Sequence, residues 1–211
     1  MTTYEIPDLD IDVKDRGKVV SYFPNAIIGS QLDKKRKIIT PHNNGVYFQN
    51  IPVDPVSGLS AFPYDMAEEL FGFYKIDLLP NHVYDLVEDE EDLVELLNRP
   101  VDWSWFLDER FYTNEDTKLI LTHLGNYNWL CNKYPPTSIE DIAVLIALVR
   151  PRKKYLYQNK KSWTFIKSVI WEKLDTENTK QYFFKKSHAI AFAHLVVLHA
   201  QIIAWELKIT K

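Results

Sequence analysis

Pro7-Asp8-Leu9-Asp10-Ile11-Asp12-Val13, near the start of the chain, alternates three carboxylates with apolar residues. Successive side chains of a β-strand point to opposite faces, so a strand here would place Asp10 and Asp12 together and the apolar residues opposite. Aspartate is a poor strand former, and like charges on one face repel unless a cation lies between them. The pattern therefore indicates either a divalent-metal site with carboxylate ligands or an edge strand with solvated acids.

A second alternating segment, residues 73–79, is closed by Pro80 and predicts another strand. Lys75 and Asp77 would share one face of it. This acid and base form either an ordinary ion pair or a metal ligand beside a phosphate-binding lysine. We expect this strand to lie next to the strand that carries Asp10 and Asp12.

The remaining elements are mostly helices. Residues 14–23 predict a short helix, residues 46–48 a strand, and residues 25–44 an irregular segment with a basic run. Apolar periodicity and capping signals predict helices over residues 82–97, 114–124, 139–149, 163–174 and 188–207. The last of these is apolar on nearly all sides, which is typical of a buried central helix.

These elements predict an α+β fold. A small mixed sheet packed by helices should occupy residues 1–100, and a mainly α-helical part should occupy residues 101–211. The two parts form either separate domains or one compact domain. The chain has 211 residues, of which 46% are hydrophobic and 26% charged, so it is long enough to bury a core.

The charges of the chain sum to −4 but are unevenly distributed. Residues 85–95 contain seven acids and no base, whereas residues 150–167 contain seven bases and no acid. A single cysteine, Cys131, excludes an internal disulfide and a thiolate metal cluster and fits a reducing compartment. No leader and no apolar run of ~18 residues is apparent, so we expect a cytoplasmic protein without a membrane partner.

Five segments resemble, in the same order, motifs of the bacterial replicative DNA polymerase III alpha subunit, the C family of DNA polymerases. The run ending at Val13 with Lys14-Asp15-Arg16 is similar to its palm motif, and His42-Asn43-Asn44-Gly45-Val46 to its His-x-x-Gly-Val segment. Residues 72–79 resemble its second palm strand, and residues 136–151 its fingers motif. Lys186-Ser187-His188-Ala189 resembles the start of its Lys-Ser-His-Ala helix.

The resemblance implies roles for individual residues. Asp10, Asp12 and Asp77 match the metal-binding, catalytic aspartates, whereas Asp8 matches an acid that is not a ligand. Lys75, Arg150, Lys186 and His188 fall where the family binds the incoming nucleotide. Basic residues are in addition candidates for contacts with the DNA backbone, which clustered Lys and Arg can neutralise: Lys34, Lys35, Arg36, Lys153, Lys154, Lys160 and Lys161.

The implied cofactor is Mg²⁺, or Mn²⁺, in a two-metal site, and the implied partners are primer-template DNA and a deoxynucleoside triphosphate. Motifs found upstream in the family are not seen, which allows for a partner polymerase or replisome subunit that supplies part of the palm. Three functions stay open from the sequence: a truncated polymerase, a non-catalytic replisome-interacting derivative, and a nucleotide- or DNA-binding derivative that keeps the metal site.

Overall fold

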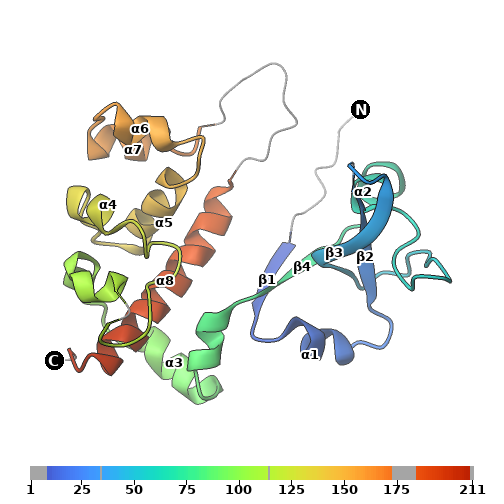
Figure 1. Cartoon of the computed structure of the whole chain (residues 1–211), viewed down its shortest axis with the longest axis horizontal. Helices are drawn as coiled ribbons and strands as arrows, with labels where there is room; N and C mark the ends of the chain where they lie inside the picture. Colours follow the sequence, from blue (N-terminus) through green and yellow to red (C-terminus); the bar gives the residue numbers. More distant parts are fainter. Residues whose placement is uncertain (1–8, 34, 114, 173–183, 210–211) are drawn as a thin grey trace. The chain divides into compact units, whose positions relative to one another are not determined.

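The computed structural model describes residues 9–33, 35–113, 115–172 and 184–209 (Figure 1). This part of the chain is a mixed α/β protein with one four-stranded mixed sheet and eight α-helices. The chain divides into two compact units, Met1–Asp85 and Leu86–Lys211. The division lies before the expected boundary at residue 100, because the helix that follows residue 89 packs with the second unit.

The sheet of the first unit has the strand order β1-β4-β3-β2, so that the first and last strands in the sequence are neighbours. Strands β1 (Leu9–Val13) and β4 (Ile76–Pro80) run parallel, whereas β3 (Ile38–Tyr47) is antiparallel to both β4 and β2 (Ile27–Asp33). The predicted pairing of the two acidic strands is therefore confirmed.

Residues 25–44 are not irregular, as the sequence had suggested, but form most of the β2–β3 hairpin. A register shift between Ile28 and Ser30 and the glycine between them interrupt the alternation that would have revealed the strands. The basic run lies at the turn, where the Asp33 side chain accepts backbone N–H groups from Lys35 and Arg36. The turn therefore presents its charges to solvent.

Two small apolar clusters stabilise the first unit. Val13, Val46 and Leu78 form one on the face of the sheet that is covered by Val19 and Val20 of α1 (Arg16–Ser21). Tyr47, Ile51 and Ala67 form the other, with Ala67 contributed by α2 (Tyr64–Phe71). Helix α2 ends at Gly72, whose φ of 70° is the left-handed conformation that favours glycine at a helix C-terminus. Each cluster buries only three residues fully, so the sheet has a thin core.

The second unit is helical over the residues described, as expected. Its helices are α3 (Glu90–Asn98), α4 (Asn128–Lys133), α5 (Ile139–Leu148), α6 (Lys154–Gln158), α7 (Trp163–Val169) and α8 (Lys186–Glu206). Short 3-10 helices span His82–Leu86, in the first unit up to Asp85, and Trp103–Leu107 and Glu109–Tyr112 in the second. One continuous apolar cluster contains residues of α4 to α8 and of the two 3-10 helices of the second unit, with α5 and α8 at its centre.

Two helix predictions need correction. The segment 82–97 is broken at Val87–Asp89, where the Asp89 side chain caps a shorter α3. No helix forms between residues 115 and 124, because Lys118 and His123 have positive φ angles and Leu121 donates its N–H to the Phe111 carbonyl instead. Position 114, the predicted cap of that helix, and residues 173–174 of the helix predicted after Trp163 lie outside the described residues.

Helix α8 was expected to be buried, and the structure confirms this expectation. By length and composition it could cross a membrane, but 67% of its apolar window is buried inside the second unit. Such burial is what the core helix of a globular protein requires. His194 lies on the exposed side, whereas His199 is buried and its Nδ1 accepts the Thr122 N–H at 3.0 Å.

Candidate functional site

The three predicted catalytic aspartates lie on two adjacent strands. Asp10 of β1 is in direct register with Asp77 of β4, and Asp12 follows two residues later on β1. In a parallel pair, residues in register project from the same face of the sheet. Asp10, Asp12 and Asp77 therefore share one face, opposite the apolar cluster of Val13, Val46 and Leu78. We call this face, with the residues around Asp77, the carboxylate face.

Asp77 is held by one cation and has one unused oxygen. The Lys75 ammonium donates to Asp77 Oδ2 at 2.7 Å, and both side chains are largely buried, with exposed fractions of 10% and 17%. Asp77 Oδ1 is buried and has no hydrogen-bond partner within the described residues. A buried carboxylate oxygen without a partner is costly, so it is a natural position for a ligand atom or a cation.

Gly45 makes the space in which Lys75 and His42 approach Asp77. It is paired with Asp77 across β3 and β4. A Cβ atom at position 45 would lie 2.8 Å from Cδ of Lys75 and 2.9 Å from Nδ1 of His42. These distances are shorter than side-chain contacts allow, so any larger residue would displace the lysine or the histidine. Glycine is thus required here by a close approach rather than by backbone conformation.

His42 is a neutral structural residue of β3. Its Nδ1 accepts the N–H groups of Gly45 at 2.7 Å and Asn44 at 3.2 Å. A nitrogen that accepts hydrogen bonds carries no proton, so the 3.8 Å separation from Asp77 Oδ1 is not an ion pair. Burial lowers the pKa of His42, and nearby Lys75 and Arg16 lower it further against the opposing effect of Asp77.

Asp12 lies in a less polar position than Asp10. Burial raises the pKa of Asp12, and the charge of Asp10 raises it further. Burial and the charge of Asp12 raise the pKa of Tyr84, in the 3-10 helix after β4. A divalent cation between the aspartates would remove the repulsion that disfavours ionised Asp12.

Two further residues approach the carboxylate face, and the sequence had not assigned them a role. The Tyr64 ring lies 5.4 Å from Nζ of Lys75 and packs edge-on against His42 at 5.1 Å. Arg16 donates from Nε to the Asn44 carbonyl at 3.4 Å, and its buried Nη2 has no hydrogen-bond partner among the described residues. Arg16 is thus a second cation near His42, in addition to Lys75.

The residues present fit a divalent cation, which takes oxygen ligands from carboxylates. Asp10 and Asp77 would supply oxygens from neighbouring strands, and Asp12 would supply a third carboxylate. Within the described ranges, no three acidic, histidine or cysteine side chains are already gathered as a preformed metal cluster.

The predicted nucleotide-binding residues outside the sheet belong to the second unit. Arg150 directly follows the C-terminal end of α5, and its guanidinium lies 4.4 Å above the Phe184 ring. Its buried Nε has no hydrogen-bond partner within the described part. Lys186 and His188 occupy the first turn of α8, two and four residues after Phe184. The structure thus brings Arg150 to the start of α8.

The predicted DNA-binding residues form two separate basic regions. Lys35 and Arg36 lie at the exposed β2–β3 turn, and Lys34 lies outside the described residues. Lys160 and Lys161 are exposed between α6 and α7, and Lys154 is partly exposed at the start of α6. Lys153 differs, because it is buried and its Nζ donates to the Glu172 carbonyl at 2.9 Å. We therefore exclude Lys153 from any surface that contacts DNA.

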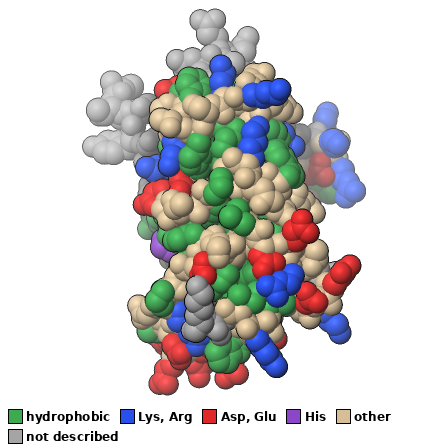
Figure 2. Space-filling model, turned by 90° about the vertical axis from the view of Figure 1, so that its left-hand side faces the viewer, with side chains coloured by type: hydrophobic (Ala, Val, Ile, Leu, Met, Phe, Trp, Pro, Cys, Tyr) green, Lys and Arg blue, Asp and Glu red, His purple; other side chains and the backbone are tan. Residues whose placement is uncertain are grey.

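Exposed aromatic rings accompany the basic residues of α6 and α7. Lys161 lies 5.2 Å from the exposed Phe165 ring, and Tyr155 is also exposed. Lysines interleaved with accessible rings suit a single-stranded nucleic acid, since the charges meet phosphates and the rings stack on bases. Figure 2 shows Lys and Arg side chains toward the top of the second unit, where α6 and α7 lie in Figure 1.

No family model, characterised protein or solved structure matches this chain. The carboxylate face is therefore interpreted from its geometry and from the motif resemblance. Of its residues, the two aspartates of β1 and the Lys75–Asp77 pair were visible in the sequence. His42 and Gly45 stood in a quoted motif, but their contact with Lys75 and Asp77 depends on strand pairing.

Proposed function

We propose that the protein performs two-metal nucleotidyl transfer in DNA replication, as a truncated relative of the polymerase III alpha subunit. One observation carries this proposal: Asp10 and Asp77, some distance apart in the sequence, are in register on adjacent parallel strands. Carboxylates on neighbouring strands can bridge a shared cation, which a solvated edge strand does not need.

Each residue of the carboxylate face has a role in this proposal. Asp10, Asp12 and Asp77 hold Mg²⁺ or Mn²⁺, and Lys75 contacts the triphosphate of the incoming nucleotide. Bound metal supplies charge stabilisation at the transferred phosphoryl group and activates the primer hydroxyl. His42 and Gly45 keep Lys75 and Asp77 in place, since His42 accepts the Gly45 N–H within β3 and Gly45 leaves room for the Lys75 and His42 side chains.

The second unit contributes binding surfaces in the same proposal. Arg150, Lys186 and His188 contact the nucleotide, and Lys154, Lys160 and Lys161 contact the DNA backbone. The Arg150–Phe184 contact and the exposed Tyr155 and Phe165 rings support this assignment. Lys35 and Arg36 of the hairpin turn provide a second phosphate contact.

A partner polymerase or replisome subunit completes the palm in this proposal. Strand β1 is an edge of the sheet, and its Leu9 and Ile11 are 43% and 49% exposed. An edge strand with exposed apolar residues can pair with or pack against another chain. We also propose a cytoplasmic location, in keeping with the single buried cysteine.

The Lys75–Asp77 ion pair favours a second candidate function. At 2.7 Å the Lys75 ammonium neutralises Asp77, so the buried carboxylate does not need a metal ion to balance its charge. A derivative that binds nucleotide or DNA, or that interacts with the replisome without catalysis, would keep this pair. Activity measurements with matched variants distinguish the two functions.

The test is extension of a primed DNA template by the full chain with Mg²⁺ or Mn²⁺, alone and with purified replicative polymerase subunits. We expect extension to fall at least 10²-fold in Asp10→Asn and Asp77→Asn, since electrostatic stabilisation of the transferred group is the largest catalytic term. Asp85→Asn, an exposed aspartate of the same unit, serves as the matched control and should retain activity.

Metal binding is measured separately, as a rise in the melting temperature of the first unit. Tryptophan fluorescence cannot follow this unit, because all six tryptophans lie in the second. Its unfolding is therefore followed by the amide NMR signals of residues 9–85. A cation at 100 times its dissociation constant adds ~2.7 kcal/mol to the free energy of unfolding. Metal binding without extension under every condition would support the second candidate. Loss of both metal binding and extension would overturn the proposal of nucleotidyl transfer.

A further inference from the structure

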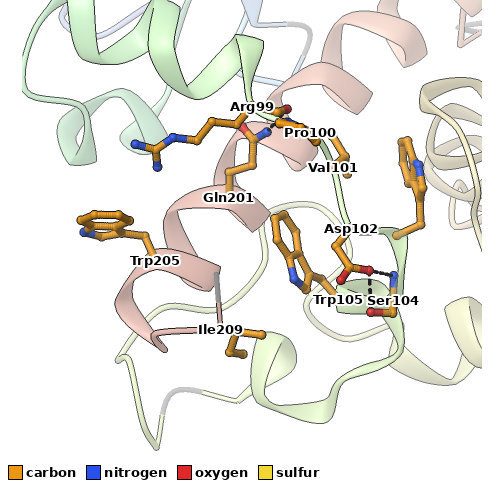
Figure 3. A pocket seen from close by; sticks show the side chains of 10 residues that line it. Arg99, Pro100, Val101, Asp102, Ser104, Trp105, Gln201, Trp205 and Ile209 are labelled. Carbon is orange, nitrogen blue, oxygen red and sulfur yellow. Dashed lines mark hydrogen bonds between the residues drawn. The ribbon is translucent and has the colours of Figure 1, made fainter. Parts of the chain in front are cut away.

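A groove in the second unit lies far along the chain from every residue of the carboxylate face. It has a volume of about 920 Å³ and is lined by the segment that follows α3 and by the C-terminal half of α8 (Figure 3). Trp105 and Trp205 stand on the two sides of the groove, with Gln201 and Ile209 between them. A volume of this size holds a drug-sized ligand or a short stretch of peptide.

The walls of the groove are aromatic and accessible. Trp205 is 59% exposed although it is large and apolar, and the Arg99 guanidinium stacks 5.1 Å from its ring. Arg99 also pairs with Glu95 at 2.6 Å, so the indole and the guanidinium are fixed at the rim. Rigid, exposed tryptophans lose little conformational entropy on binding, which is why they dominate binding hot spots.

Two buried polar atoms of groove residues have no hydrogen-bond partner among the described residues: Nε1 of Trp105 and Oε1 of Gln201. Trp105 is 8% exposed and Gln201 is 3% exposed, and the other amide atom of Gln201 donates to the Arg99 carbonyl at 3.0 Å. Unpaired buried groups cost about 1–3 kcal/mol each. The indole is a donor and the amide oxygen an acceptor, so together they match an N–H and a carbonyl of a peptide backbone.

The charges around the groove identify the kind of ligand. Arg99 is neutralised by Glu95, and the Asp102 carboxylate accepts from the backbone and hydroxyl of Ser104. The charged side chains at the groove are thus Arg99 and Asp102 of the lining and Glu95 beside them, two carboxylates and one guanidinium. Five further acids and no base follow away from the groove over residues 88–92, on and before α3. Figure 2 shows Asp and Glu toward the bottom of the second unit, where α3 lies in Figure 1. This excess of negative charge repels a phosphate backbone and attracts basic residues.

We propose that this groove binds an extended peptide segment of a partner protein, with an apolar or proline anchor between Trp105 and Trp205 and basic residues beside α3. Extended peptides, above all proline-containing ones, bind in aromatic-lined grooves through side-chain anchors and backbone hydrogen bonds. The anchor fills the groove, the backbone pairs with Trp105 Nε1 and Gln201 Oε1 after small rotations of these side chains, and the flanking charges face Glu95. Nucleic acid binds elsewhere on the protein. The proposal does not depend on metal binding by the carboxylate face.

The test is selection of a random twelve-residue peptide library on the full chain, followed by fluorescence anisotropy with the enriched synthetic peptides. We expect enriched peptides to contain an aromatic residue or proline flanked by Lys or Arg. Trp205→Ala should weaken their binding at least tenfold, whereas Trp129→Ala, a change at another exposed tryptophan on α4, should leave it unchanged. Because both rings are exposed, neither change should unfold the chain.

A second measurement reports on the buried donor. The indole ¹H–¹⁵N signal of Trp105, assigned with a Trp105→Phe variant, should shift downfield on addition of an enriched peptide. Raised salt and Glu95→Gln should each weaken binding of the basic peptides. Enrichment of acidic peptides, equal binding by the Trp205→Ala variant, no enrichment at all, or displacement of the peptide by single-stranded DNA would each overturn the proposal.

Discussion

The two units of the protein differ in how they distribute charged and apolar side chains. The first unit has two small buried clusters and concentrates three carboxylates and two cations around a four-stranded sheet. The second has one continuous apolar cluster around α5 and α8 and carries its aromatic and charged residues at the surface. Polar groups that must approach a ligand weaken a small sheet, whereas a large helical core tolerates exposed binding residues without loss of packing.

The largest expected effect tests the core of the second unit. Leu145 of α5 is fully buried, and Leu145→Ala should lower the free energy of unfolding of this unit by about 2–5 kcal/mol through lost burial and a cavity. Tryptophan fluorescence follows the unfolding selectively, since every tryptophan lies beyond residue 85. Metal-dependent NMR shifts of the first unit should persist, and their loss would show that the units fold as one.

Ile120→Ala is the matched control for that variant. Ile120 is 47% exposed in the same unit, so its truncation should change the free energy of unfolding by about 0.5 kcal/mol or less. A large effect of Ile120→Ala would mean that the segment between residues 115 and 124 contributes more to stability than its burial indicates.

The next effect tests the tight packing of the carboxylate face. Gly45→Ala places a methyl group within 3 Å of both Lys75 and His42, which should cost about 1–3 kcal/mol of stability in the first unit and abolish metal-dependent stabilisation. Asn43→Ala, an exposed change two residues away, should do neither. Thermal unfolding followed by the amide NMR signals of residues 9–85, with and without Mg²⁺, measures the stability and its dependence on metal. Unchanged metal binding in Gly45→Ala would show that the close packing at Gly45 is not needed for the metal site.

A smaller effect is expected at the start of α5. The Ser138 hydroxyl accepts the Asp141 N–H at 3.1 Å, so Ser138→Ala should cost about 1 kcal/mol of stability in the second unit. Ser138→Asp should restore it, because aspartate caps a helix equally well. Urea unfolding followed by tryptophan fluorescence measures the change, and an unaffected midpoint in the alanine variant would show that Thr137 and Asp141 suffice.

The smallest effect concerns Asp12 and has a defined sign with pH. Because burial raises the pKa of Asp12, its contribution to stability is complete below its unfolded pKa, about 3.9, and is lost as the pH rises through the folded value. Asp12→Asn should therefore raise the melting temperature of the first unit slightly at pH 7, by less than about 1 kcal/mol in free energy. Mg²⁺ should reverse the order of the two proteins at pH 7, and a destabilised asparagine variant without metal would contradict the pKa direction.

The sequence predicted the elements that have strong local signals. Alternation and the terminal Pro80 indicated β4, a capping signal before residue 139 indicated α5, and all-round hydrophobicity indicated the burial of α8. The observed cap of α5 is local, since the Ser138 hydroxyl accepts the N–H of Asp141 three residues later.

What the sequence did not predict depends on contacts between distant residues. The β2–β3 hairpin was missed because a register shift breaks its alternation, and the expected helix after residue 114 gives way to a bond between Leu121 and Phe111. In the candidate site, we expected the strands of Asp10 and Asp77 to be neighbours, but their parallel direction and their register could not be predicted. The close approach of Lys75 and His42 at Gly45 and the contact of Tyr64 with both follow from the fold as a whole.

The short bond between Lys75 and Asp77 has a consequence for how the protein responds to its ionic surroundings. The Lys75 ammonium balances the charge of the buried Asp77 carboxylate. A divalent ion that bound Asp77 would compete with this ammonium, and Lys75 would then be able to pair with an anion. Loading with metal and capture of a phosphate group would thus be linked through one exchange of counter-ions, and each would favour the other.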